Sequence, residues 1–536
     1  MIKITNIKLA FDHQPQELTK TAARKLKVAE DAILSLSVKR RSLDARANRP
    51  LTRVYTVEVE VQDEKSCAPL VEKRTDLAYS EGKTYQMPTF QVRDTRGKPL
   101  IIGTGPAGTF AGLILAEAGN PPIFIERGKT ARERVSDVDR FWKKGELDPE
   151  SNVQFGEGGA GTFSDGKLTT RVKDRYQRTN KILVEMVAAG APPEILYESK
   201  PHVGTANLVR VVENLRQKIE DLGGEYRFET RLEDLVLEGG RVAGIELSTG
   251  ENIAASTVIL AIGHSARDTF NMLLARGVEI VPKPFSAGFR IEHPQGMIDR
   301  AQYGKQAGHP DLGAADYQLS FRTSLGRTVY SFCMCPGGSV IGASSETEGL
   351  VTNGMSQYAR NGRNANSAIV AEVFPDDFAG HPLAGFQLQR TWEQKAFQLG
   401  GGGYYAPVQS AVDFLQGRIS DQLGKTQPSY QPGVRLADLN QALPEYLTAA
   451  IREALGEFNR RIPGFAGGEA VLTGVETRTS CPLRILRGKD GQSVSVPGLY
   501  PAGEGSGYAG GIMSSAIDGI KAAEKILQAG HETQAN

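Results

Sequence analysis

Cysteine and long apolar runs are both scarce in this chain. Only four of the 536 residues are cysteine, at positions 67, 333, 335 and 481, which is too few for a secreted disulfide scaffold and typical of a reducing compartment. The N-terminus alternates like a strand and lacks the apolar core of a signal peptide. No stretch approaches the roughly 20 apolar residues needed to span a bilayer. The sequence therefore predicts a cytoplasmic protein without a membrane-spanning segment.

The net charge of the chain is also close to zero, and its sequence has no spacing typical of metal ligands. The formal charge of +1 at pH 7 excludes a general attraction to nucleic acid or to an anionic membrane. The seven histidines are scattered without metal-ligand spacing, so we expect no bound metal. Glycine, by contrast, is abundant, with 60 residues that gather in a few loops. The length of the chain suggests two to four domains.

Residues 98–126 have the order of a dinucleotide-binding unit. Leu100–Ile102 and Ile123–Ile125 are apolar runs suited to buried parallel strands. Between them a G-x-G-x-x-G motif opens a helix; its first glycine allows a tight turn, its second admits a pyrophosphate and its third lets the helix pack on the strand. The motif residues that we expect to contact a dinucleotide are Gly103, Gly105, Pro106, Ala107 and Gly108. An ordinary strand-turn-helix is the alternative.

The second strand ends on an acidic residue, eighteen positions after the last glycine of the motif. At that place Glu126 can accept both hydroxyl hydrogens of an adenosine ribose, and we include its neighbour Arg127 in the same site. The helix after the motif directs its first amides and the positive end of its dipole toward the phosphates. Strand, loop, helix and acid together favour dinucleotide binding.

A second glycine-rich loop spans residues 155–168, with five glycines between 156 and 166. Such a loop is unsuited to a helix or strand interior, but its backbone can lie against a flat or charged ligand. Its predicted cofactor-binding residues are Gly159, Gly161, Thr162, Ser164, Lys167 and Leu168. Residues 156–161 also spell G-x-G-x-x-G, yet no good strand precedes them, and a bland flexible loop is the alternative.

Two later stretches add to the site. Residues 257–263 are typical of a buried parallel strand whose tip meets a ligand, with Ala261 and Gly263 as predicted contacts. His264 follows, and we expect a helix-capping or surface histidine there rather than a catalytic one. Residues 497–523 return to strand, glycine loop and long helix. The predicted contacts in that stretch are Gly503, Glu504, Gly511, Ile512 and Met513.

Residues 1–63 have the pattern of a small α+β module, with strands over 2–10, 32–38 and 54–61 and a helix over 15–26. Residues 1–60 carry twelve Lys and Arg against seven Asp and Glu, densest around Arg40, Arg41 and Arg46. This cluster indicates either an RNA or anion contact or a solvated loop with partly paired charges. Residues 64–97 are polar, with turn signals at 80–83 and 94–97, and are expected to be a linker.

The glycine loops, Glu126, the 257–263 strand and the 500–513 loop and helix together resemble the flavin-binding superfamily that includes glutathione reductase and succinate dehydrogenase. The stretches 155–168, 332–338 and 503–518 resemble, more narrowly, a family of uncharacterised FAD-dependent dehydrogenases. The resemblance implies an α/β fold and non-covalent FAD. The expected domains are an N-terminal α+β module and linker (1–95), a Rossmann-type FAD-binding domain in two segments (96–281 and 481–536) and an inserted α+β substrate domain (282–480), which is rich in proline and irregular loops.

The resemblance also implies roles at the flavin. The amides of Ile512 and Met513 would face the flavin N1–C2=O edge and stabilise the anion formed on reduction. Where the superfamily usually has Asp, this sequence has Glu504. No second strand–G-x-G-x-x-G–helix unit is found, so NAD(P)H is expected only as a transient electron donor. The redox cysteine pair of glutathione reductase is absent after the first helix, which disfavours a disulfide reductase.

Four residues are candidates for chemistry beside the flavin: Cys333, Cys335, Arg290 and Tyr508. On a strand, Cys333 and Cys335 would share one face and form a dithiol or a substrate-thiol site. The alternative is two small residues that fill a core, and C-x-C closes too short a loop for an unstrained disulfide.

Three further charged residues are considered with them. Glu292 would share a strand face with Arg290, and the two either hold a substrate carboxylate or pair with each other. Arg478 and Arg484 lie where the insert returns to the FAD-binding domain, and they either bind an anion or are solvated.

These features predict an FAD-dependent oxidoreductase that transfers hydride between flavin N5 and an organic small molecule held by the insert. One alternative is a flavin-dependent RNA-modifying protein guided by the basic N-terminal module. Another is a flavin-binding sensor without turnover.

Overall fold

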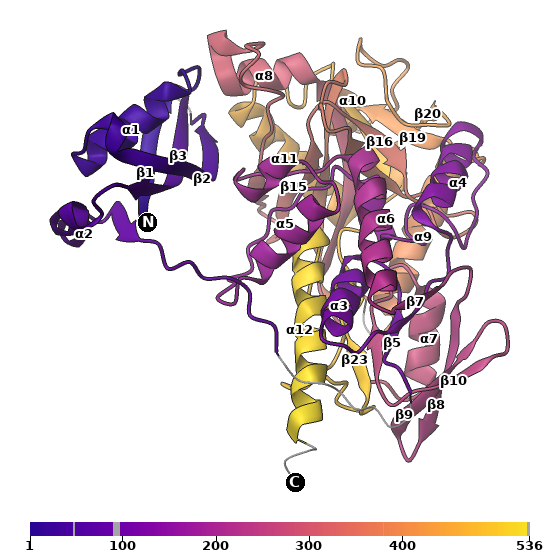
Figure 1. Cartoon of the computed structure of the whole chain (residues 1–536). Helices are drawn as coiled ribbons and strands as arrows, with labels where there is room; N and C mark the ends of the chain where they lie inside the picture. Colours follow the sequence, from indigo (N-terminus) through magenta and orange to yellow (C-terminus); the bar gives the residue numbers. More distant parts are fainter. Residues whose placement is uncertain (47–48, 89–96, 379, 533–536) are drawn as a thin grey trace.

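The computed structural model describes residues 1–46, 49–88, 97–378 and 380–532. It contains an N-terminal module, a parallel-sheet domain and a larger sheet domain inserted into it (Figure 1). The predicted fold class is confirmed: α/β, with a Rossmann-type domain in two segments, an inserted α+β domain and a small N-terminal α+β module. The predicted boundary between residues 95 and 96, and residues 94–96 of the predicted turn, lie outside the described residues.

The N-terminal module is an antiparallel sheet with strand order β2-β3-β1-β4. Its elements are β1 (Ile2–Ala10), α1 (Gln16–Leu26), β2 (Ile33–Asp44), β3 (Thr52–Val61), α2 (Ala68–Lys73) and β4 (Leu77–Tyr79). The linker expected over 64–97 begins later, because residues 77–79 pair with β1. The module contacts the parallel-sheet domain through Arg41, whose N–H donates to the Tyr197 carbonyl at 2.7 Å and whose carbonyl accepts from the Ser199 N–H at 2.8 Å.

Five parallel strands in the order β23-β11-β5-β6-β7 form the central sheet of the second domain. Alternate residues of these strands face two different cores. Ile101 and Ile259 pack with the helices α3, α6 and α12, whereas Leu100 and Leu260 pack with α7 and the small antiparallel sheet β10-β9-β8.

The first segment of this domain contains β5 (Leu100–Ile102), α3 (Pro106–Glu117), β6 (Ile123–Ile125), α4 (Ala131–Lys144), α5 (Arg178–Ala188), α6 (Thr205–Asp221), β7 (Glu225–Arg227), β8 (Leu232–Glu238), β9 (Arg241–Leu247), β10 (Asn252–Ala254), β11 (Val258–Leu260), α7 (Arg267–Ala275) and β12 (Ile280–Pro282). The second contains β22 (Leu483–Ile485), β23 (Leu499–Pro501) and α12 (Ile512–Glu532). The long helix α12 lies beside α3 (Figure 1), and a Cβ on Gly519 would stand 2.0 Å from the Ala107 carbonyl oxygen. The two segments therefore meet at backbone contact distance.

The inserted domain is built on a seven-stranded sheet with the order β14-β15-β18-β13-β21-β19-β20. Its pairs are antiparallel except β19 with β20. The elements are β13 (Phe285–Pro294), α8 (Gln295–Tyr303), β14 (Ser320–Arg322), β15 (Thr328–Cys335), β16 (Gly338–Gly342), β17 (Thr352–Ser356), β18 (Asn364–Val373), α9 (Ala384–Leu399), β19 (Ala406–Ser410), α10 (Ala411–Gln416), β20 (Val434–Leu436), α11 (Glu445–Arg461) and β21 (Val471–Glu476). Regular structure is more extensive here than the expected irregular loops. The chain enters and leaves the insert through β12 and β22, which pair with each other.

Among the helices of the described residues, none combines the length and apolar character needed to cross a membrane.

Candidate functional site

A cavity of about 600 Å³ lies where the parallel strands end at their carboxyl edge, the edge at which ligands bind in open α/β sheets. The loops after β5, β6, β11 and β23 form part of its wall, together with the second glycine loop and residues of the insert. The predicted cofactor-binding residues that line it are Gly103, Gly105, Pro106, Ala107, Glu126, Arg127, Gly159, Gly161, Ser164, Lys167, Ala261, Gly263, Gly503, Glu504, Gly511 and Ile512. Stretches far apart in the sequence thus surround one space.

The other four predicted contacts lie behind the cavity wall. A Cβ on Gly108 would stand 2.0 Å from the Gly103 carbonyl oxygen, so this glycine serves the close packing of α3 on β5. The buried Thr162 hydroxyl donates to the Glu157 carbonyl at 3.2 Å. Leu168 and Met513 are buried in the core beneath the helices. These residues support the wall and do not form it.

Three features of the wall fit a bound dinucleotide. Helix α3 has no side-chain cap among the described residues, so its first amides are available to an anion at the cavity. A Cβ on Gly105 would approach only the Gly159 Cα, at 3.9 Å, and one on Gly511 would meet nothing within 4 Å. The buried Nε2 of His264 has no hydrogen-bond partner in the described part of the chain. A ligand in the cavity can use all three.

Glu126 joins the loops around the cavity through its carboxylate. One oxygen accepts from the Thr104 N–H at 3.0 Å and from its hydroxyl at 2.6 Å, and the other accepts from the N–H groups of Gly128 and Gly156, each at 3.0 Å. These four bonds match the acceptor capacity of an ionised carboxylate. Contact with a ribose stays a prediction for Glu126, and the structure adds a positioning role that its place in the sequence did not indicate.

Arg134 of α4 shapes the second glycine loop from behind. Its side chain is 0% exposed and donates to the carbonyls of Asn152 at 2.7 Å, Val153 at 2.8 Å, Gly156 at 3.3 Å and Glu157 at 2.8 Å. Burial lowers the pKa of Arg134 to about 10. Sequence reasoning missed this residue because it lies in a charged helix that has the pattern of a surface element.

His264 and Glu504 face each other in the cavity wall. The expectation of a capping or surface histidine is wrong: His264 is 8% exposed, lines the cavity and has its Nδ1 3.6 Å from a Glu504 oxygen. Burial, together with the charges of Arg478 and Arg267, lowers the pKa of His264 to about 3. Burial raises the pKa of Glu504 to about 7. Near neutral pH the cavity therefore holds a neutral imidazole beside a carboxyl that can gain or lose a proton.

The prediction that Cys333 and Cys335 of β15 share one face of the strand is wrong. The pairing of β15 with β18 shifts register between Phe332 and Cys335, as at a β-bulge. Cys333 has a φ of 45° and lines the cavity, whereas Cys335 is fully buried. The extra residue at the bulge turns the two side chains to different environments.

The other two catalytic candidates lie outside the cavity wall. Arg290 is fully buried and pairs with Glu476, its Nη1 lying 3.2 Å from both carboxylate oxygens, and not with Glu292 as the strand pattern suggested. Tyr508 is 39% exposed, and its ring contacts the guanidinium groups of Arg484 and Arg487. Neither residue is placed to touch a ligand in the cavity.

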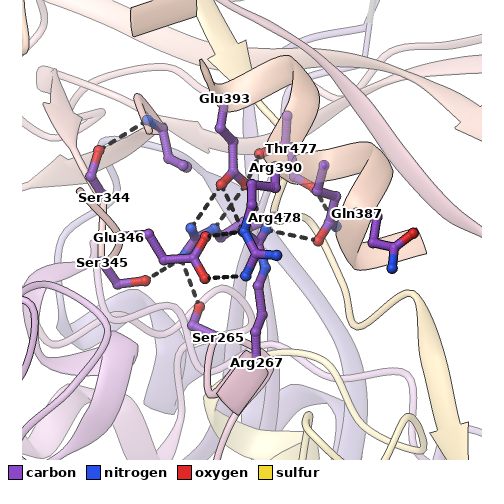
Figure 2. A network of polar contacts seen from close by, with 12 residues as sticks. Ser265, Arg267, Ser344, Ser345, Glu346, Gln387, Arg390, Glu393, Thr477 and Arg478 are labelled. Atoms are coloured by element: carbon purple, nitrogen blue, oxygen red, sulfur yellow. Dashed lines mark hydrogen bonds and ion pairs between the residues drawn. The ribbon is translucent and has the colours of Figure 1, made fainter. Parts of the chain in front are cut away.

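Arg478 lines the cavity, but its charge is already paired. Figure 2 shows the Glu393 carboxylate directed toward the guanidinium groups, and it pairs with both Arg267 and Arg478. The Arg478 Nε and Nη2 donate to the two Glu393 oxygens at 3.1 and 2.9 Å, and its Nη1 donates to the hydroxyls of Ser265 and Ser345. The two arginines hold the pKa of the buried Glu393 well below its usual range against the opposing effect of burial. Arg478 is thus a fixed part of the wall and not a solvated side chain.

The fold and the cavity together define a protein with a Rossmann-type domain and a cavity at the edge of its sheet where dinucleotides bind. A family model described as FAD-dependent protein, C-terminal domain-like, matches residues 284–479, and a model of a domain of unknown function matches residues 1–60. The chain is 46% identical over 529 residues to an uncharacterized protein of Clostridium beijerinckii, an alignment that covers 98% of each chain. At this identity and coverage, the chain belongs to the same family of FAD-dependent proteins.

Other proteins resemble this chain over a shorter alignment or with a lower identity and TM-score. Protein FixC of Escherichia coli (strain K12) is 28% identical over 204 residues, which are 37% of this chain and 44% of FixC. A crystal structure of glycine oxidase from Bacillus cereus aligns with a TM-score of 0.32 at 12% identity, covering 81% of this chain and 95% of the oxidase.

Proposed function

We propose that this protein is an FAD-dependent oxidoreductase that transfers hydride between flavin N5 and an organic small molecule held against the inserted domain. One observation carries the proposal: the cavity whose wall contains the dinucleotide motif also contains Tyr330, Phe332 and Cys333 of the insert. A substrate between the flavin and this strand would meet apolar rings, a thiol and the amide of Asn353. FAD, when bound, supplies the two-electron redox chemistry.

The residues of the chain have separate tasks in this proposal. Gly103, Gly105 and the start of α3 bind the pyrophosphate, and Glu126 holds the loops that surround the adenosine end. The N-terminus of α12, at Gly511 and Ile512, faces the charge that reduction would place on the flavin. Glu504 holds or releases a proton near neutral pH, beside the neutral imidazole of His264.

NAD(P)H is proposed as a transient donor that binds over the flavin. The described residues contain a single parallel sheet with a dinucleotide loop, and the insert is built on a mainly antiparallel sheet. The donor and the substrate would therefore occupy the same cavity in turn.

A small-molecule substrate is proposed in preference to RNA because three basic side chains of the module's cluster already have carboxylate partners within the protein. Arg41 forms an ion pair with Glu198, Arg46 with Asp44, and Lys39 with Glu58. Guanidinium groups held by carboxylates are less available to phosphates.

The test begins with the flavin content of the purified protein, followed by anaerobic titration with NADH and with NADPH. We expect a bleachable flavin spectrum, then reoxidation by some members of a panel of organic acceptors and of RNA. A variant Gly105→Val places a branched side chain between the two glycine loops and should lose the flavin. The matched control is Gly456→Ala, in the exposed face of α11, where an added Cβ meets nothing within 4 Å.

Two results would contradict the proposal. One is a protein that remains colourless with added FAD. The other is a flavin whose rates of reduction and reoxidation no small molecule changes, and that result would favour the sensor alternative. Reoxidation by RNA alone would instead favour the RNA-modifying alternative.

A further inference from the structure

Cys333 has an unusual backbone conformation at the wall of the cavity. Its φ of 45° lies in the left-handed region, which residues other than glycine rarely adopt. The β-bulge that contains it leaves Phe332 opposite Ala368 and Cys335 opposite Asn366. Bulges of this kind redirect a side chain next to a functional site. Here the redirected side chain is a thiol in the cavity wall.

Two cations from different elements surround this bulge. Lys167, in the second glycine loop, lines the cavity and donates from Nζ to the Met334 carbonyl. Arg290, on β13, donates from Nη2 to the Cys333 carbonyl at 2.7 Å and lies 3.9 Å from the Cys335 sulfur. Their carboxylate partners are Asp165, 3.6 Å from Lys167, and Glu476, 3.2 Å from Arg290.

The two thiols of the bulge differ in acidity as well as exposure. The neighbouring Cys335 thiol, with the positive charges of Lys167 and Arg290, holds the pKa of Cys333 well below its usual range, against burial and the charge of Asp165. The neighbouring Cys333 and burial hold the pKa of Cys335 well above its usual range. Elsewhere in the chain, burial raises the pKa of Cys481 to about 12. Cys333 is also the one cysteine of the four that is not fully buried, and all four are described residues.

We propose that Cys333 is a nucleophile of the cavity that forms a covalent bond with a soft electrophile, either a conjugated carbonyl compound or a disulfide. The proposal deepens the proposed function and rests on it for the flavin that shares the cavity. Cys335 acts as a positioning residue, because its S–H donates to the Cys333 carbonyl at 3.3 Å and holds the main chain of the reacting residue. Lys167 lies where a developing negative charge would be stabilised.

The covalent step needs no external oxidant. With a conjugated carbonyl compound, the sulfur lone pair forms a C–S bond to the β-carbon, the C=C electron pair moves toward the carbonyl oxygen, and the resulting enolate takes up a proton. With a disulfide, one S–S bond forms as another breaks, and the leaving thiolate takes up a proton. Neither route requires a bond between Cys333 and Cys335.

The experiment measures the pH dependence of alkylation at each cysteine. FAD-loaded and FAD-free protein are treated with iodoacetamide between pH 5 and pH 10, and the four cysteines are quantified by peptide mass spectrometry. We expect Cys333 to be labelled first, with a midpoint at least about one pH unit below that of the same residue in the urea-unfolded chain, where a thiol titrates near 8.5. The flavin absorbance of the same samples reports FAD binding separately, so failure of the cofactor site is distinguishable from failure of the thiol.

Two variants test the cause of the shift. Cys335→Ala removes the S–H donor and Lys167→Met removes the ammonium group, and each should raise the midpoint of Cys333. The control is Lys218→Met on α6, whose ammonium group pairs with Glu117 and Glu185 and which should leave the midpoint in place. Lys167→Met keeps the test decisive if Cys335→Ala does not fold.

Two further probes identify the class of electrophile. N-ethylmaleimide represents conjugated carbonyl compounds and glutathione disulfide represents disulfides. Modification of Cys333 by either, with the same low midpoint, supports the proposal and names the class. The proposal is overturned if Cys333 titrates like the unfolded chain, if neither variant moves its midpoint, or if no probe modifies it in FAD-loaded or FAD-free protein.

Discussion

At the scale of single residues, the wall of the cavity is held by charged groups bonded to the main chain. The Glu126 carboxylate accepts three backbone N–H groups and one hydroxyl, and the Arg134 guanidinium donates to four backbone carbonyls. Both side chains act on the second glycine loop, where Gly156 bonds to each of them. A glycine-rich loop has a high conformational entropy in the unfolded chain, and these ionic contacts offset part of the cost of ordering it.

Arg134→Met should disorder this loop, because up to four carbonyls lose a charged donor in a place without solvent. Each unsatisfied buried polar group costs about 1–3 kcal/mol, so we expect a loss of at least roughly 3 kcal/mol in the free energy of urea unfolding, together with weaker FAD binding by absorbance titration. Arg134→Lys should be nearly as damaging, because one ammonium group cannot reach the same set of carbonyls.

Arg132→Met is the control in the same helix, since the Arg132 side chain is 81% exposed. It should change stability by less than about 0.5 kcal/mol. Equal losses in the Arg132 and Arg134 variants would show that the carbonyl contacts contribute little.

Glu504→Gln should change how stability depends on pH. Burial raises the pKa of Glu504 in the folded protein to about 7, above the value of about 4.3 expected in the unfolded chain. Between these two pH values the folded state binds a proton on Glu504 that the unfolded state does not bind. The stabilisation that comes from this protonation is therefore complete below about pH 4 and is lost as pH rises through 7.

Glutamine cannot titrate, so the stability of the variant relative to the wild type should rise by roughly 2 kcal/mol between pH 5 and pH 8. Urea-unfolding midpoints at the two pH values measure this difference. Parallel changes in both proteins would contradict the assignment.

At the scale of elements, the part of the cavity wall that the parallel-sheet domain forms depends on glycines that let main chains approach. A Cβ on Gly112 of α3 would lie 2.1 Å from the Phe124 ring, and one on Gly519 of α12 would lie 2.0 Å from the Ala107 carbonyl oxygen. Ala107 belongs to the cavity wall and α12 begins in it. The spacing of these helices therefore positions two parts of the cavity wall relative to each other.

Gly519→Ala should separate α12 from α3, because the atom that the new Cβ meets is backbone and cannot rotate away. Overpacking of this kind costs about 1–3 kcal/mol, and we expect a lower thermal midpoint together with a lower FAD content. Gly456→Ala is the matched control in a helix: its Cβ enters open space, and the higher helix propensity of alanine should stabilise the protein by up to about 1 kcal/mol. A Gly519→Ala variant as stable and as yellow as the wild type would contradict the close-packing argument.

Local patterns predicted those parts of the site that local sequence determines. Strands β1, β5 and β6, the start of α3 and the glycine loop before α12 follow from apolar runs and glycine spacing, and the structure has them at the predicted places. The seven-stranded sheet was missed because β13 pairs with β18 and β21, and both of these strands lie far from β13 along the chain. The burial of His264 was missed for the same kind of reason, since its neighbour Glu504 comes from the other segment of the domain.

The bulge at Cys333 shows a second limit of pattern reasoning. Alternation along a strand assigns faces only while the register is regular. One extra residue between Phe332 and Cys335 separated two side chains that the pattern had placed together. The register depends on the partner strand β18, which the spacing of two cysteines does not reveal.

At the scale of the whole molecule, a buried ionic network joins the two sheet domains at the cavity. Arg267 begins α7 of the parallel-sheet domain, Glu393 lies on α9 of the insert, and Arg478 follows β21. Thr477 adds a hydroxyl that donates to Glu393 at 2.8 Å. Because Arg478 and the nearby His264 both line the cavity, the network fixes cavity residues and the relative position of the domains together.

Glu393→Gln should therefore affect both domains. The change leaves two buried guanidinium groups without their shared carboxylate, and breaking a buried pair costs about 3–5 kcal/mol. We expect a loss of this size in the free energy of unfolding and a weaker affinity for FAD, because Arg478 would no longer be held in the wall.

Glu346→Gln is the matched control, because Glu346 also pairs with Arg267 but its side chain is 27% exposed. Solvent can replace part of that contact, so the loss in the free energy of unfolding should stay near about 1 kcal/mol. If the two variants lose the same stability, or if Glu393→Gln binds FAD as tightly as the wild type, the network does not couple the domain contact to the cavity.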